Sequence, residues 1–205
     1  MIALDVADWR RHVFALYTRV RSTTDVTTAH ELWRRGRDEL FATHPSTPLL
    51  PEDRPGFTGL PVEPYDPAWR FEVEITPAAE PQHMEVETGT DGTVPFDLLG
   101  VVDVPGVGPL DVWRLASYAG GIFLPVRDGL AGIRGGTYGG GRYLLDTVKG
   151  ADLGPGIAPD SLVLDFNFAY NPSCAYDPAW ACPLAQPGNR TKVEIPAGER
   201  YSGNY

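Results

Sequence analysis

Apolar residues recur at helical spacing in the N-terminal part of the chain. Over residues 5–21 they form one face of a predicted helix, made of Trp9, Val13, Leu16, Tyr17 and Val20. A second helix is predicted from Thr28 to about Phe41, because Thr28 and Glu31 have the spacing of a capping box. Its inner face carries Leu32, Trp33, Leu40 and Phe41, and its outer face carries Arg34, Arg35 and Arg37. Four prolines between residues 45 and 55 end this helical part.

After about residue 56 the pattern changes to the two-residue alternation of β-strands. Gly, Pro or Asp residues separate eight such segments, and no helical period lies between them. The segments are 69–75, 83–88, 95–104, 109–115, 121–128, 140–148, 161–168 and 192–198. We therefore predict an α+β fold that is mainly antiparallel β, a β-barrel or sandwich-like meander with two N-terminal helices. Residues 1–55 would form a helical N-terminal cap and residues 56–205 an antiparallel β domain, the two making one folding unit.

Composition and charge narrow the class of partner. The chain has 205 residues, no apolar run of the length that a membrane span needs, and no apolar core of a signal peptide at its start. A cytoplasmic location without membrane contact is therefore expected. The net charge of −10 disfavours nucleic-acid binding, which needs a basic surface. A small molecule is the expected partner, and the oligomeric state is left open.

The glycine-rich segment 135–146, "GGTYGGGRYLLD", raises the question of a phosphate-binding loop. A dinucleotide-binding loop is followed by a helix, whereas a strand is predicted to follow here. One alternative is a hairpin in which glycines supply positive φ angles. Another places Tyr138, Arg142 and Tyr143 in a pocket, where the arginine would hold a carboxylate or phosphate.

A second polar segment, "LDFNFAYNPSC", follows the predicted strand 161–168. Asp165 and Asn167 lie on one face of that strand, where an acid beside an amide could act as a base with an orienting partner. Tyr170 and Asn171 come directly after them. The competing interpretation is structural, because Asp and Asn side chains commonly satisfy the backbone of turns.

The two cysteines of the chain, Cys174 and Cys182, are separated by seven residues. A zinc site would need two further ligands, and the spacing matches no common zinc finger. A disulfide is sterically feasible but is opposed by a reducing cytosol. A nucleophilic thiol needs an activating base or cation, and none stands nearby in the sequence. The last alternative is that two small buried side chains hold a loop in place.

Taken together, these segments resemble the bacterial and archaeal proteins grouped as domain of unknown function 1684. The resemblance covers nearly the whole chain and is most specific in "TYGGGRYL" (137–144) and "LDFNFAYNPSCAYDPAWACPL" (164–184), with "NRTKVEIPAGE" (189–199) at its end. It implies relatives but no reaction. The loop 129–136 departs from the family pattern, since Leu130 and Ala131 stand where hydroxyl side chains are expected and Gly136 replaces an acidic residue.

The leading hypothesis is an enzyme that acts on a small anionic or polar organic molecule, in a pocket formed by the TYGGGRY and DFNxAYNPxCAY segments. Its predicted catalytic residues are Asp165, Asn167 and Asn171, and its predicted binding residues are Tyr138, Arg142, Tyr143, Tyr170 and Cys174. The hypothesis requires Arg142 and Asp165 to share one face of the sheet. The alternatives are a noncatalytic β-barrel that binds a small molecule, in which Asp165 is held by backbone donors, and a thiol or metal site at the two cysteines. No metal ligands are predicted, and the sequence assigns no cofactor.

Overall fold

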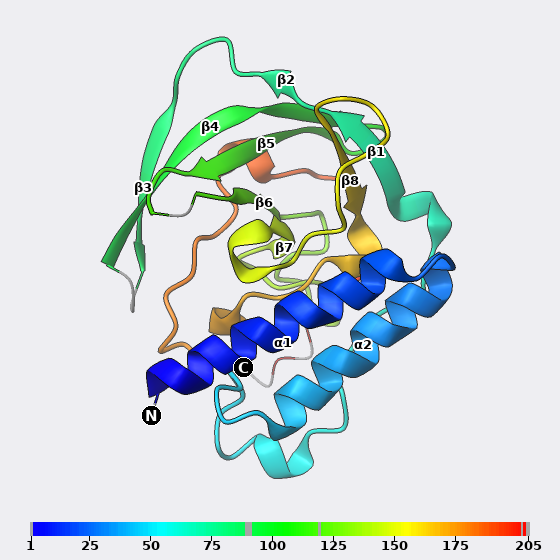
Figure 1. Cartoon of the computed structure of the whole chain (residues 1–205), viewed down its shortest axis with the longest axis vertical. Helices are drawn as coiled ribbons and strands as arrows, with labels where there is room; N and C mark the ends of the chain where they lie inside the picture. The colour runs from blue at the N-terminus through cyan, green and yellow to red at the C-terminus, as the bar shows by residue number, and fades with distance from the viewer. Residues whose placement is uncertain (1, 89–91, 119, 202, 204–205) are drawn as a thin grey trace.

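Two long helices and eight strands form the regular structure of the described residues, in a computed structural model that describes residues 2–88, 92–118, 120–201 and 203 (Figure 1). Helices α1 (Ile2–Ser22) and α2 (Val26–Thr43) lie side by side and confirm the predicted pair. The cap of α2 differs from the prediction, because Asp25 accepts a hydrogen bond from the backbone N of Thr28 at 2.8 Å. None of the helices in this part of the chain is long and apolar enough to span a membrane.

The strands pair in an antiparallel manner in two sheets. Their bounds are β1 (Arg70–Glu74), β2 (Thr76–Pro77), β3 (His83–Thr88), β4 (Gly92–Val104), β5 (Gly108–Leu115), β6 (Ile122–Val126), β7 (Arg142–Asp146) and β8 (Ser161–Asp165). One sheet has the order β2-β4-β5-β6-β7, with β3 also paired to β4, and the other joins β1 to β8. The predicted α+β class, mainly antiparallel, is thus confirmed. No pairing among the described strands closes them into a barrel, so the barrel or sandwich remains a prediction.

Short 3-10 helices turn the chain before, between and after the strands. They are Arg54–Gly56, Pro67–Trp69, Thr147–Lys149, Phe166–Phe168, Ser173–Ala175 and Pro187–Asn189.

The predicted strand at 192–198 is wrong. This segment is irregular, although Ile195 and Ala197 are fully buried. The backbone carbonyls of both residues accept hydrogen bonds from the guanidinium of Arg142. A side chain on β7 therefore takes the place of a neighbouring strand in satisfying this backbone.

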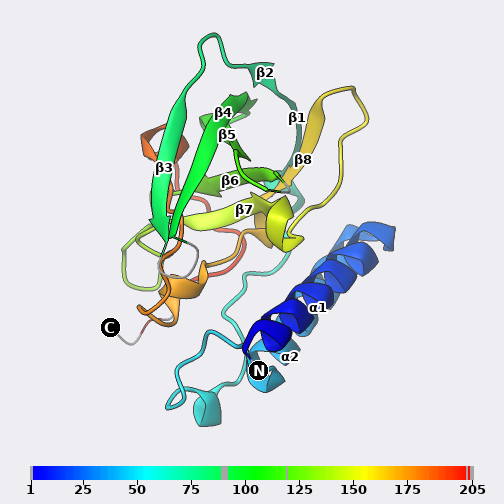
Figure 2. The same cartoon turned by 60° about the vertical axis from the view of Figure 1, so that its left-hand side comes forward.

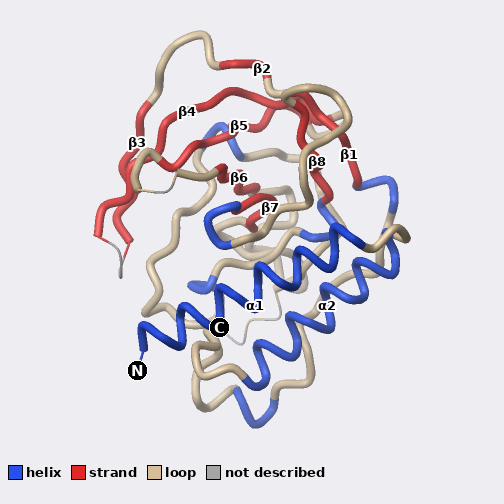
Figure 3. Tube along the Cα trace, in the orientation of Figure 1, coloured by secondary structure: helices blue, strands red, loops and turns tan. Residues whose placement is uncertain are grey.

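The helix pair packs on one side of the β part, below β7 (Figure 2). Apolar side chains of the helices, including Leu16, Tyr17 and Trp33, form one cluster with Ala151 and Phe168 from the β part. A larger cluster lies between the two sheets and includes residues of β1, β4, β5, β6, β7 and β8. The tube in Figure 3 shows how the segment after β8 runs between the sheets and the helices. The assignment of residues 1–55 as a cap on one folding unit stays a prediction.

Candidate functional site

Arg142, at the start of β7, is fully buried and its guanidinium contacts the protein's own groups. It forms an ion pair with Asp128 and donates to backbone carbonyls of the segment 195–199. The other oxygen of the Asp128 carboxylate accepts from Leu130 N at 2.8 Å and from the Thr137 hydroxyl at 2.7 Å. Arg142 therefore ties the divergent loop 129–136 to the segment 195–199.

Asp165, at the end of β8, is also fully buried. It accepts hydrogen bonds from Arg70 at 2.9 Å, from the Tyr65 hydroxyl at 3.3 Å, and from both the backbone N and the side-chain amide of Asn167. The Asn167 amide in turn bonds the backbone N and O of Asp66. This pair joins the end of β8 to the segment that precedes β1.

Arg142 and Asp165 consequently have separate sets of partners. Their strands are not paired with each other, since β7 pairs with β6, and β8 pairs with β1. The two segments meet one step further along, at an isolated bridge between Tyr143 and Tyr170. Neither Arg142 nor Asp165 lines the cavity at this junction. Their roles as anion anchor and acid–base group stay predictions.

That cavity lies between the helix pair and the β part and has a volume of about 70 Å³. Three of the predicted site residues line it: Tyr143, Tyr170 and Asn171. The helices contribute an apolar wall of Trp9, Val13, Leu16, Leu40 and Phe41 together with Tyr17 and Arg37. The remaining lining residues are Pro48, Lys149, Ala151, Pro172 and Ser173. The structure thus brings the two predicted segments together at this cavity, and the helix pair forms the rest of the cavity wall.

A buried ion pair stands beside the cavity. The guanidinium of Arg37 lies 2.6 Å from the carboxylate of Glu199, which also accepts from the backbone N and side-chain amide of Asn171 and from the Tyr176 hydroxyl. Arg37 is stacked near the rings of Trp33, Phe41 and Tyr170, at 4.9 to 5.3 Å from their centroids. The prediction that Arg37 faces solvent is wrong, since its side chain is 11% exposed.

Burial determines the ionisation of these groups. It raises the pKa of Glu199 against the opposing charge of Arg37 and the hydrogen bonds of Asn171. It raises the pKa of Tyr17 to about 12 and places those of Tyr143 and Tyr170 well above the usual value. The three tyrosines therefore present neutral hydroxyl groups at neutral pH.

Glu199 makes the stability of the protein depend on pH. Since its pKa is raised from 4.5 in the folded state, the folded protein binds more protons than the unfolded chain above that pH. Stability from this group is therefore present at low pH and falls as the pH rises from about 4.5 toward the folded pKa.

Glu199→Gln is expected to reduce the loss of unfolding free energy between about pH 5 and pH 7. Urea unfolding followed by circular dichroism at both pH values measures it. Glu194→Gln, at an exposed position in the same segment, is the control and should keep the wild-type difference. An identical pH dependence in Glu199→Gln and wild type would contradict the assignment.

The other predicted binding residues lie beyond the cavity. The Tyr138 hydroxyl is 3.4 Å from the backbone carbonyl of Cys174 and 3.7 Å from its sulfur. The Tyr138 ring packs against Tyr201, with centroids 4.9 Å apart. Tyr138 and Cys174 therefore form a second contact region. It adjoins the cavity through Ser173, which lines the cavity and precedes Cys174 in the chain.

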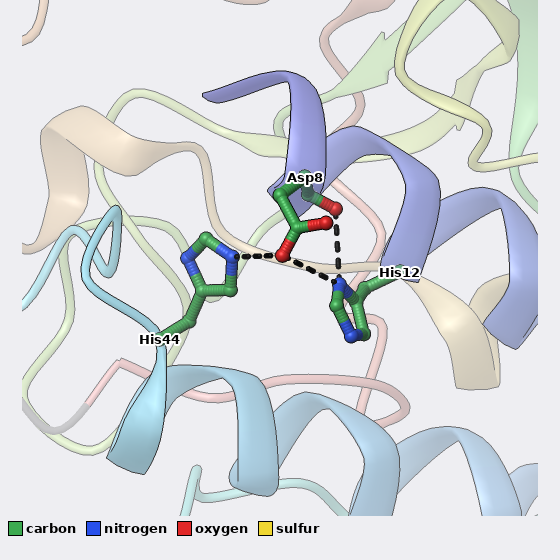
Figure 4. Close-up of side chains that lie close together, drawn as sticks. All are labelled: Asp8, His12 and His44. Carbon is green, nitrogen blue, oxygen red and sulfur yellow. Dashed lines mark hydrogen bonds and ion pairs between the residues drawn. The ribbon is translucent and has the colours of Figure 1, made fainter. Parts of the chain in front are cut away.

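Asp8, His12 and His44 form a cluster of possible metal ligands at the N-terminal end of α1 (Figure 4). Both histidine nitrogens lie 3.5 Å from the same Asp8 carboxylate oxygen. However, Nδ1 of His44 accepts a hydrogen bond from the backbone N of Ser46 at 3.0 Å. In a neutral ring the proton is then on Nε2, the atom that faces Asp8, and no lone pair is left for a metal. Metal-bound histidines instead donate from their second nitrogen, so these residues do not fit a metal site as they stand.

Sequence reasoning missed Arg37, Glu199, Tyr17 and Tyr176 as site residues. One signal for Glu199 was present, because it ends the motif "IPAGE". Gly198 has φ +76°, and a Cβ there would lie 2.5 Å from the carbonyl of Phe166. Glycine is therefore required where the chain passes the end of β8 and directs Glu199 inward. A signal for Arg37 was present too, because it lies four residues after Trp33 and four before Phe41, on the inner face of α2, unlike Arg34 and Arg35.

Comparisons with known proteins agree with the resemblance found in the sequence. The model of the family described as "Protein of unknown function (DUF1684)" matches residues 55–200. An uncharacterized protein of Haloarcula marismortui, whose structure was solved in solution by NMR, is 33% identical. The similarity covers 87% of this chain and 95% of that one, with a TM-score of 0.60. No match was found among the curated proteins. The chain belongs to the DUF1684 family.

Proposed function

We propose that the protein binds a small organic molecule in the cavity between the helix pair and the β part. The observation that carries the proposal is the composition of the cavity wall, which is apolar on the helix side apart from Tyr17 and Arg37, and which bears hydroxyl groups and Lys149 on the other side. Small-molecule sites commonly combine an apolar wall with a few polar groups. A volume of about 70 Å³ has room for about five water molecules, so the ligand is small.

The polar groups of the cavity favour a ligand with a hydrogen-bond acceptor. In the described part of the chain, no protein group accepts a hydrogen bond from the hydroxyls of Tyr17, Tyr170 or Ser173. Lys149 adds a positive charge. Its side chain is 49% exposed, and its ammonium nitrogen lies 3.8 Å from a carboxylate oxygen of Asp146. A carboxylate or carbonyl group on an otherwise apolar molecule would meet both the hydroxyls and the ammonium group.

Binding without acid–base chemistry at Asp165 is the function that we favour over an enzyme. Four donor atoms occupy the Asp165 carboxylate, and the side chain is fully buried away from the cavity lining. A catalytic base must reach the proton that it removes. The enzyme hypothesis would need a different acid–base group. The proposal includes a cytoplasmic location for the protein.

Butyrate and benzoate serve as probes of the cavity. Each is expected to raise the unfolding temperature in a saturable, concentration-dependent way, because a ligand that binds the folded state stabilises it. Tyr170→Phe should weaken binding about tenfold, the effect of losing one hydrogen bond to a charged group. Ligand titrations followed by tryptophan fluorescence measure this, since Trp9 lines the cavity.

Two variants make the result specific to the cavity. Tyr118→Phe removes the same hydroxyl from a side chain that is 99% exposed, and it should bind the probes as wild type does. Val13→Trp fills the cavity from the α1 side and should abolish the shift. Binding that survives Val13→Trp, or the absence of any shift with both probes, would refute the proposal.

A further inference from the structure

A second cavity lies at the other end of the helix pair from the cavity lined by Tyr170. It is placed where α1 turns into α2, opposite the start of β1 (Figure 1), and is called the turn cavity below. Its volume is about 240 Å³, against about 70 Å³ for the first cavity. Among the described residues none lines both, so a ligand of the turn cavity is independent of the ligand of the first.

The charge of the turn cavity is opposite in sign to that of the whole chain. Arg21 and Arg70 line it and no acidic residue does, although the net charge of the chain is −10. Two carboxylates, those of Asp25 and Asp152, belong to residues next to the lining in the sequence. Each accepts a hydrogen bond from a backbone N at 2.8 Å, and neither lines the cavity. The wall therefore favours an anionic ligand.

Arg21 is held in place by neutral groups. Its guanidinium donates to the backbone carbonyl of Asp152 at 2.6 Å and to the Thr18 hydroxyl at 3.2 Å. The segment after Asp152 also passes close to its stem, since a Cβ on Gly154 would lie 3.5 Å from Cδ of Arg21. In the part of the chain that the structure describes, no carboxylate forms an ion pair with Arg21. The positive charge is thus positioned without being neutralised, which suits an anion site.

Two further groups add hydrogen-bond donors to the wall. Arg70 uses Nη1 to donate to Asp165 at 2.9 Å, and its side chain is 36% exposed. Within the described residues nothing accepts from its Nε and Nη2 or from the Thr24 hydroxyl. A phosphate group carries several strong acceptor oxygens, so it matches donors on both sides of the cavity better than a carboxylate does.

The rest of the wall is apolar. Val20, Ala29 and Phe168 are buried and belong to the cluster that joins the helices to the β part, and Leu153 packs against this cluster. All four line the turn cavity. A ligand that fills it therefore needs an apolar body as well as an anionic group.

We propose that the turn cavity binds a phosphate monoester with a small apolar body. The phosphate lies between Arg21 and Arg70, and the apolar body lies against Val20 and Phe168. Guanidinium groups bind phosphate with paired hydrogen bonds, and the apolar wall gains from the burial of the organic group.

Phenyl phosphate is the probe, titrated into the full chain labelled with ¹⁵N and followed by amide chemical shifts. Saturable shifts are expected at Thr23, Thr24, Val26 and Leu153, and not at residues 170–173 of the first cavity. Inorganic phosphate lacks the ring and should bind about tenfold more weakly or worse. Benzoate keeps the ring but has fewer acceptor oxygens, so it should also bind more weakly here. Equal affinity of benzoate and phenyl phosphate at these amides would overturn the assignment to a phosphate monoester.

Arg21→Gln is expected to weaken the binding of phenyl phosphate about tenfold, the effect of losing charge-assisted hydrogen bonds. Arg21→Lys keeps the charge without the paired donors and should lose less. Arg19→Gln is the matched control, because it removes the same charge from an exposed side chain in the same last turn of α1, outside the lining. It should change the affinity by less than about twofold, since a distant exposed charge is screened.

The amide spectrum of each free variant shows whether the fold is kept. The proposal is overturned if folded Arg21→Gln and Arg19→Gln bind phenyl phosphate equally well. It is also overturned if phenyl phosphate shifts the amides of residues 170–173 and leaves those of the turn cavity unchanged, or if it causes no saturable shift.

Discussion

Replacement of Asp128 by alanine is expected to lower the free energy of unfolding by about 3–5 kcal/mol. The change removes the carboxylate that pairs with Arg142 and leaves a guanidinium that is 0% exposed without its ion-pair partner. It also removes the acceptor of the Thr137 hydroxyl and of the backbone N of Leu130, so that the loop 129–136 loses its attachment. Urea unfolding followed by circular dichroism measures the change.

An exposed ion pair provides the matched control. Asp97 lies 2.7 Å from Arg114, and these side chains are 35% and 58% exposed. Asp97→Ala should therefore cost about 1 kcal/mol or less. In a double-mutant cycle with Arg142→Met, Asp128→Ala should cost much less than it does in wild type, because no buried charge is then left unpaired. Equal costs for Asp128→Ala and Asp97→Ala would show that the buried pair is not formed.

Trp33→Ala is expected to cost about 3–5 kcal/mol. The Trp33 side chain is fully buried between α2 and the β part and packs against Phe168, with ring centroids 5.2 Å apart. Its indole N–H donates to the Tyr17 hydroxyl at 3.0 Å, which joins the two helices. Removing the ring creates a cavity where the helix pair meets the β part, and thermal and urea unfolding both report the loss.

Trp33→Phe separates packing from hydrogen bonding, since it keeps an aromatic ring and removes the N–H donor. Its cost should be clearly smaller than that of the alanine variant. Trp180→Ala changes a partly exposed tryptophan in the irregular segment after Tyr176 and should have the smallest effect of the three. If Trp33→Ala and Trp180→Ala destabilise the protein equally, the helix pair does not depend on Trp33 for its packing.

The fold was predictable wherever burial alternates in a regular way along the sequence. The spacing of Trp9, Val13 and Leu16 predicts α1, and the alternation in 83–88 predicts β3 with its observed bounds. The segment 192–198 has the same alternation without forming a strand. Its buried carbonyls are satisfied by Arg142, a residue fifty or more positions away, and no local pattern reveals such a partner. Pairing between distant strands is hidden for the same reason.

The candidate site was predictable only in part. Tyr143 stands out in the glycine-rich segment, and Tyr170 and Asn171 stand out after the strand 161–168, and all three line one cavity. Arg37 was assigned to the outer face because an arginine on a helix normally faces water, although its spacing from Trp33 and Phe41 places it on the inner face. It is buried here through its contacts with Glu199 and three aromatic rings that come from distant parts of the chain. Asp165 looks catalytic in the sequence, and its donors become visible only in three dimensions.

The segment 195–199 also has a consequence for biosynthesis. It leaves the ribosome after every described strand, yet it supplies partners to Arg142 on β7 and to Arg37 on α2, which lies 162 positions before Glu199. Until the ribosome has synthesised this segment, both guanidinium groups lack those partners and stay hydrated. Contacts of such large sequence separation also carry a high loop-closure cost, which slows folding. The helix pair is therefore expected to dock after translation of this segment, in a step that a nascent chain stalled before residue 195 cannot complete.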